Sequence, residues 1–172
     1  TILASALLAL SGLAGNAADL RLVTAAKNGD RATVAALLQQ KLDVNAPEAD
    51  GTTALHWAVR SDDLDLADRL IKAGANVKTS NRYGITPLSL ACTNGNGPVV
   101  ERLLTAGASP NAVLPGGETP LMTAARTGSL AAVKALLSHG ATVDARDDTR
   151  GQTALMWAAA EGHVDVVRTL IA

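Results

Sequence analysis

A period of about 33 residues is the sequence feature that most limits the fold of this chain. A threonine-Xaa-leucine motif recurs at this spacing, and a glycine precedes each copy by two residues. The motifs begin at Thr53, Thr86, Thr119 and Thr153, after Gly51, Gly84, Gly117 and Gly151. Apolar pairs keep the same period at Leu37-Leu38, Leu70-Ile71, Leu103-Leu104, Leu136-Leu137 and Leu170-Ile171. Units this short cannot bury an apolar face alone, so the period predicts a stack of similar units.

Each unit is expected to contain two antiparallel helices. The repeated threonine is placed to cap the first helix, and Pro87 and Pro120 occupy the first helical position, where no N–H is needed. Glycines that can adopt the left-handed conformation end this helix at Gly29, Gly95, Gly128 and Gly162. The second helix is then capped by Asp30, Asp63, Asn96 and Ser129. A polar, hairpin-like loop leads to the next threonine.

These residues resemble the ankyrin-repeat family, whose unit is a β-turn plus two helices with a Thr-Pro-Leu-His signature. The resemblance implies an all-α ankyrin-repeat solenoid of about five stacked helix-turn-helix units joined by hairpin-like loops, over residues 18–172. The expected units are about 19–46, 47–79, 80–112, 113–145 and 146–172, the last of them truncated. His56 keeps the signature histidine, whereas Ser89, Met122 and Met156 replace it and remove a hydrogen bond between neighbouring loops. One extra residue lengthens the loop near 146–150.

The first 18 residues differ from the rest because they carry no charge. Ile2 to Ala14 form an apolar run that is shorter than the ~20 residues a bilayer-spanning helix needs, but it has the length of a signal-peptide core. Gly15 and Ala17 are the small residues expected before a cleavage site. We therefore expect 1–17 to be a signal-peptide remnant of a bacterial protein that is periplasmic or secreted, with membrane contact only through this segment. The alternative is a retained cap helix over the first unit, which is equally compatible with a cytoplasmic location.

Composition argues against several classes of function. There are 15 basic and 16 acidic side chains, so the net charge of -1 is unlike that of a nucleic-acid binder or a polybasic membrane-surface protein. Aromatic residues make up 2% and phenylalanine is absent, which predicts a core of Ala, Leu and Val. The single cysteine, Cys92, excludes an internal disulfide and a Cys-based zinc cluster, and its register predicts a small buried position.

The sequence predicts no catalytic, metal or cofactor site. His56, His139 and His163 occupy different registers and should not converge. The glycines at 95–97 and 116–117 lack the spacing of phosphate-binding loops, and the acidic residues at 144–148 lack the pattern of a calcium loop. We therefore expect no small-molecule substrate.

Binding by surface is the remaining function. The family resemblance implies that such arrays bind proteins through a concave helix face and the loop tips. One row of this face holds Trp57, Leu90, Thr123 and Trp157, with Arg60 and Arg126 three positions after two of them. The loop tips add Asn81, Arg82, Tyr83, Val113 and Leu114. Tryptophan and arginine are typical of interface hot spots, although the tryptophans can instead pack between adjacent units.

The sequence therefore predicts a non-catalytic scaffold for an unidentified protein partner. Two alternatives stay open. In the first alternative, the chain is the recognition arm of a longer multidomain protein whose active domain lies beyond residue 172. The apolar character of the last helix suggests this, at Val164, Val166, Val167 and Leu170. In the second alternative, the chain is a purely structural spacer.

Overall fold

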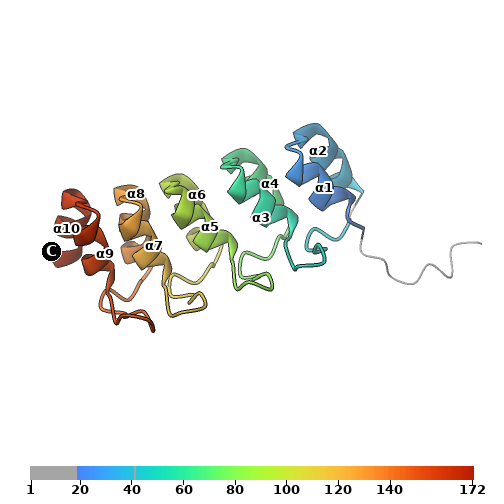
Figure 1. The fold of residues 1–172 in the computed structure, drawn as a ribbon. Coiled ribbons are helices and arrows are strands. Elements are labelled where there is room, and N and C mark those ends of the chain that lie inside the picture. The colour runs from blue at the N-terminus through green and yellow to red at the C-terminus, as the bar shows by residue number, and fades with distance from the viewer. Residues whose placement is uncertain (1–18, 41) are drawn as a thin grey trace, which may run out of the picture.

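The computed structural model describes residues 19–40 and 42–172, so the predicted signal segment 1–17 lies outside the described residues. Within those ranges the chain forms ten α-helices and no strand, arranged as five helix-turn-helix pairs in an elongated array (Figure 1). The first helices of the pairs are α1 (Arg21–Lys27), α3 (Ala54–Arg60), α5 (Pro87–Asn94), α7 (Pro120–Arg126) and α9 (Ala154–Ala160). The second helices are α2 (Arg31–Gln39), α4 (Leu64–Lys72), α6 (Gly97–Thr105), α8 (Leu130–Ser138) and α10 (Val164–Ile171). The prediction of an all-α solenoid is confirmed.

The helix ends follow the capping pattern of the sequence. The repeated threonine is the N-cap of α3, α5, α7 and α9, and the hydroxyl of Thr86, for example, accepts a hydrogen bond of 3.1 Å from the Ser89 N–H. Asp30, Asp63, Asn96 and Ser129 cap the second helices in the same way, as predicted. None of the described helices combines the length and the apolar character that crossing a membrane requires.

One of the turns between paired helices has an aspartate at the position where the other turns have glycine. Asp62 stands where the other units have Gly29, Gly95, Gly128 or Gly162, and it is the one non-glycine residue of the described chain with a positive φ, of 59°. This conformation is sterically unfavourable for a residue with a Cβ atom, although aspartate tolerates it better than most. The Asp62 carboxylate accepts hydrogen bonds from the side-chain amides of Asn94 and Asn96, at 3.3 and 2.9 Å. The turn is therefore held to the next unit by its side chain.

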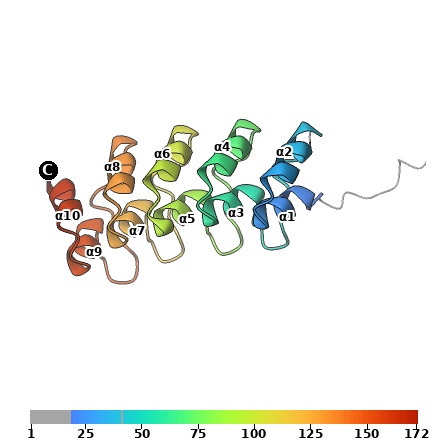
Figure 2. The same ribbon diagram turned by 90° about the horizontal axis from the view of Figure 1, so that it is seen from above.

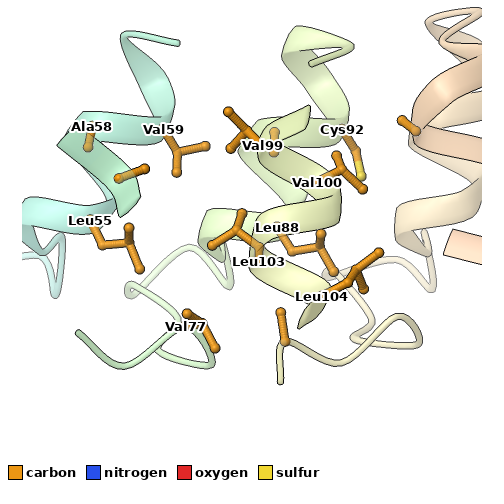
Figure 3. Close-up of a cluster of buried hydrophobic side chains, with 14 of the residues drawn as sticks. Leu55, Ala58, Val59, Val77, Leu88, Cys92, Val99, Val100, Leu103 and Leu104 are labelled. Carbon is orange, nitrogen blue, oxygen red and sulfur yellow. The ribbon is translucent and has the colours of Figure 1, made fainter. Parts of the chain in front are cut away.

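The core is a continuous layer of small and medium apolar side chains between the units. The first helix of every unit has a buried alanine in the same register, at Ala25, Ala58, Ala91, Ala124 and Ala158. Figure 3 shows Leu55 and Val59 of α3 beside Leu88, Val99 and Leu103 of the next unit. The first member of each apolar pair is buried in the first four units, whereas Leu170, its counterpart in the last unit, is half-buried. Cys92 is fully buried as predicted, and this burial raises the pKa of its thiol to about 12.

The two layers of helices differ in how closely neighbouring units approach. Figure 2 shows the layers from above, with the first helices on the side of the loops. Consecutive first helices are in contact at all four junctions, whereas the second helices are tightly packed between α6 and α8 and only loosely elsewhere. The array is therefore shorter along its first helices, which makes this layer the inner side. At the tight junction, a Cβ added to Gly97 would lie 2.5 Å from the Cβ of Ala131.

Replacing Gly97 with alanine is expected to destabilise the stack. Gly97 has no positive φ, so the change tests steric contact with Ala131 and not backbone strain. Because α6 and α8 must move apart to admit the methyl group, we expect a loss of stability of about 1–3 kcal/mol, measured as a lower urea midpoint by circular dichroism. Adding Ala131→Gly to this variant should restore part of the loss. An unchanged midpoint in Gly97→Ala would contradict the tight packing of α6 on α8.

Candidate functional site

The candidate site is the exposed side of the first-helix layer together with the tips of the loops that precede these helices. We call this surface the inner face. Each loop is closed like a hairpin by two backbone hydrogen bonds. In the first loop, the Glu48 N–H donates to the Thr52 carbonyl oxygen at 2.8 Å, and the Gly51 N–H donates to the Glu48 carbonyl oxygen at 2.9 Å. Asn81, Leu114 and Asp147 take the place of Glu48 in the following loops. The loop at Asp147 is one residue longer, which confirms the predicted insertion.

His56 ties the loop of its own unit to the next loop. Its Nδ1 lies 3.2 Å from the Thr53 backbone N and 2.9 Å from the Thr53 Oγ1, so Nδ1 is the acceptor and the proton is assigned to Nε2. The Nε2–H group then donates to the Ile85 carbonyl oxygen, at 3.1 Å. Burial of the ring, which is 1% exposed, lowers the pKa of His56 below its ordinary value of 6.5. The histidine is therefore a neutral structural tether.

The residues that replace this histidine do not reach the next loop. The Ser89 hydroxyl accepts from the Thr86 N–H and donates to the Thr86 carbonyl, at 3.0 and 2.8 Å. The sulfur of Met122 lies 3.4 Å from the Thr119 backbone N, again within its own unit. The predicted loss of the loop-to-loop side-chain bond at these two positions is confirmed.

A second link between loops depends on a backbone N–H that Pro115 lacks. Arg82 N–H donates to the Asp50 carbonyl at 2.8 Å, and Asp148 N–H donates to the Gly116 carbonyl at 2.9 Å. Pro115 occupies the equivalent place between these two junctions and cannot donate. Its ring packs on Gly84 instead, where an added Cβ would lie 2.7 Å from Pro115 Cδ.

Tyr83 and Val113 project from the two loop tips that Pro115 and Gly84 bring together. They are 61% and 60% exposed, and the guanidinium carbon of Arg82 lies 5.5 Å from the centre of the Tyr83 ring. Leu114 is half-buried, and the Asn81 side-chain oxygen accepts hydrogen bonds from the N–H groups of Tyr83 and Ile85. Asn81 therefore shapes the tip, whereas Tyr83 and Val113 are its accessible apolar groups.

Trp57 is the centre of the first cluster on the inner face. Its indole N–H donates to Glu48 Oε2 at 3.0 Å, and Glu48 Oε1 accepts from Lys27 Nζ at 3.2 Å. Lys27 Nζ and the guanidinium carbon of Arg60 lie 4.5 and 5.7 Å from the ring centre, within the range of cation–π attraction. The ring is half-buried and held by groups from two units. This tryptophan therefore packs at the junction between two units and keeps part of its ring exposed.

The second cluster lies at the junction of α7 and α9. Glu118 Oε1 accepts from the Thr123 hydroxyl at 2.8 Å and from Arg126 at 3.2 Å. The guanidinium carbon of Arg126 lies 5.7 Å from the centre of the Trp157 ring. Thr123 is only 1% exposed, so this predicted contact residue supports Glu118 from below.

The indole N–H of Trp157 has no acceptor among the described residues. Asp147 stands where Glu48 stands in the first cluster, but its shorter side chain turns into its own loop. The Asp147 carboxylate accepts from the Thr149 hydroxyl and from the backbone N–H groups of Thr149, Arg150 and Gln152. These hydrogen bonds, led by the one from the Thr149 side chain, lower the pKa of Asp147 to about 2. The two tryptophan clusters therefore occupy equivalent positions, but only the first includes a carboxylate that accepts the indole hydrogen bond within the described residues.

The structure sorts the eleven predicted contact residues by accessibility. Arg60, Arg82, Tyr83, Val113 and Arg126 are exposed; Trp57, Asn81, Leu90, Leu114 and Trp157 are half-buried; Thr123 is buried. Leu90 lies in the row between the two clusters. Sequence reasoning missed Glu48 and Glu118 because the two glutamates occupy different loop positions, so no shared register marks them.

Comparison with known proteins agrees with this architecture. The family model described as ankyrin repeats (3 copies) matches residues 22–113 and 88–172. The chain belongs to the ankyrin-repeat family. An ankyrin repeat protein of Fowlpox virus (strain NVSL) is 43% identical over 47 residues, which are 27% of this chain. The match spans only 13% of the length of that relative. Ankyrin repeats are generally modules of protein–protein interaction and are typically not catalytic.

The ankyrin stack shows no gathering of reactive groups in the part of the chain that the structure describes. Its three histidines are apart: His56 lies under a loop, His139 Nε2 is 3.1 Å from Glu101 Oε1, and His163 Nε2 is 3.0 Å from the Arg126 carbonyl oxygen. No group of three or more His, Cys, Asp or Glu side chains there could hold a metal ion. A hollow of about 660 Å³ beside α1 is lined largely by apolar atoms, with Leu20 and Leu37 among its residues.

The His56 tether predicts a pH-dependent stability. The unfolded chain binds a proton at His56 with a pKa near 6.5, whereas the folded pKa is lower, so stability should fall as the pH drops below about 6.5. His56→Ser copies the arrangement at Ser89 and should cost roughly 0.5–1.5 kcal/mol at about pH 7.5. Its stability should then decline less than that of the wild type on going to about pH 5, which stays above the usual carboxylate range. Urea midpoints at the two pH values measure both effects.

His139→Gln is the matched control for this experiment. The His139 ring is exposed on the second-helix side and takes no part in the loop tether. Its removal should leave most of the wild-type decline in place. An equally steep decline in His56→Ser and in the wild type would show that another group is responsible.

Proposed function

We propose that this chain is a non-catalytic scaffold that binds a partner protein through its inner face and loop tips. The observation that carries the proposal is that Trp57 is held in a fixed position while part of its ring stays exposed. Hydrogen bonding to Glu48 and the two flanking cations hold the ring in place without a partner. A rigid aromatic side chain beside an arginine loses little conformational freedom on binding, which is the property of an interface hot spot.

The surface around Trp57 supports a contact area that extends over several units. Leu90 continues the row as a half-buried apolar residue, and Arg60 beside the Trp57 ring is exposed. Tyr83 and Val113 add two accessible apolar side chains at the neighbouring loop tips. Accessible apolar side chains grouped beside an arginine are a typical mark of a protein-binding surface. The second-helix side also has exposed apolar side chains, at Leu64, Val164 and Ile171, but it carries charges of both signs beside them.

Site-specific cross-linking tests this proposal directly. A photoreactive amino acid placed at position 90 should cross-link to a partner protein in the source cells. The same group at position 69 is the control, because Arg69 is exposed on α4 and has no ion pair within the described residues. Equal cross-linking from both positions, or from neither, would contradict binding at the inner face.

Substitution of Trp57 separates binding from packing. Trp57→Ala should weaken partner capture by about tenfold or more, as expected for a hot-spot residue. Because the ring also packs at a junction, stability must be measured alongside, and capture must be assayed well below the unfolding midpoint. A variant that remains folded and captures the partner as well as the wild type does would favour a structural spacer.

We also infer that residues 1–17 direct export to the periplasm or the exterior of a bacterial cell. The uncharged apolar run and the small residues Gly15 and Ala17 support this inference. Amino-terminal sequencing of the protein from its source should find a mature chain that begins at Ala18. A chain that still carries Ile2 to Ala14 would contradict cleavage and favour the cytoplasmic alternative.

A further inference from the structure

The charges of the first helices are all of one sign. These five helices contain Arg21, Lys27, Arg60 and Arg126 but no aspartate or glutamate. The second helices contain four acidic residues among their basic ones, at Asp65, Asp68, Glu101 and Asp165. The whole chain has a net charge of -1, so the positive character of the inner layer is not a consequence of overall composition.

Most of these cations are already neutralised by loop residues. Lys27 is paired with Glu48 and Arg126 with Glu118, each at 3.2 Å. Arg21 lies at the end of the array and is paired with Asp19 at 2.6 Å. Arg60 makes no ion pair within 19–40 and 42–172. It is therefore the cation of the inner layer that is available to an acidic group from outside.

The nearest acidic residue along the chain does not neutralise Arg60. Asp62 follows two residues later, but its carboxylate accepts hydrogen bonds from the amides of Asn94 and Asn96. Arg60 lies instead beside the Trp57 ring, with its guanidinium carbon 5.7 Å from the ring centre. An arginine held against an aromatic ring keeps its planar group free to bind a carboxylate through two hydrogen bonds.

Apolar surface accompanies this free cation. Leu90 is half-buried and lies one unit further along the row than Trp57. Neighbouring helices pack about 8–10 Å apart, so a ligand that contacts both units must place its two groups at roughly this separation. In an extended polypeptide this distance corresponds to about three residues, at ~3.3 Å per residue.

We propose that the inner face binds a polypeptide segment that carries a carboxylate side chain for Arg60 and, about three residues away, an apolar side chain for Leu90. This inference rests on the proposed function and adds the chemistry of the partner. Charge complementarity favours the acidic side chain, since the first helices carry no acidic residue and Glu48, the loop carboxylate beside Trp57, is already paired with Lys27. A nucleic acid fits less well, because its successive phosphates require several unpaired cations.

Selection from a random peptide library displayed on phage tests the proposal without knowledge of the natural partner. Peptides selected on the wild-type protein should be enriched in Asp or Glu close to Leu, Ile or Met. Arg60→Glu should weaken binding of the selected peptides by about tenfold or more, and selection on this variant should lose the acidic preference. Arg69→Glu makes the same charge change on α4 and is the matched control, which should bind the peptides as the wild type does. Circular dichroism establishes that both variants are folded.

Several outcomes would overturn the proposal. These are selected peptides without acidic enrichment, binding that Arg60→Glu and Arg69→Glu weaken equally, and a selection that yields no specific peptide. Tight binding of a single-stranded oligonucleotide that Arg60→Glu abolishes would assign the cation to nucleic acid instead. Cross-linking of a partner protein from position 90 would still support the scaffold function in each of the first three cases, so the two failures can be distinguished.

Discussion

Burial of small apolar side chains between neighbouring units is the constraint on which the rest of the structure depends. The five alanines that begin at Ala25 allow consecutive first helices to approach closely at every junction. The second helices remain further apart except between α6 and α8, where Gly97 lies against Ala131. The resulting difference in length places the first helices on the inside of the array, and the loops beside them form its accessible edge. The position of the candidate site thus follows from packing.

Much of the fold can be read from the sequence because its determinants are local and repeated. Thr86 and Asn96 cap their helices as the motif predicts, and Cys92 occupies the small buried position that its register indicates. Asp62 is harder to foresee, because its positive φ is compensated by amides from the next unit. The close approach of α6 and α8 likewise depends on a pair of residues in different units.

The candidate site is only partly predictable, because register specifies where a side chain begins and not what surrounds it. Thr123 and Trp57 share one register, yet Thr123 is buried beneath Glu118 and Trp57 is clamped by Lys27 and Glu48. Trp157 has no acceptor within the described part of the chain because Asp147, one methylene shorter than glutamate, bonds to its own loop instead. Such differences depend on side-chain length and on partners in other units, which a single-sequence period does not encode.

The burial of Cys92 has a practical consequence for studying this stack. The protein contains one cysteine, and its thiol is fully covered and remains protonated at neutral pH because burial raises its pKa to about 12. An alkylating reagent can therefore modify it only during openings of the third unit and its neighbours. The alkylation rate of Cys92 therefore measures how often the middle of the stack opens, and no cysteine has to be introduced for this measurement.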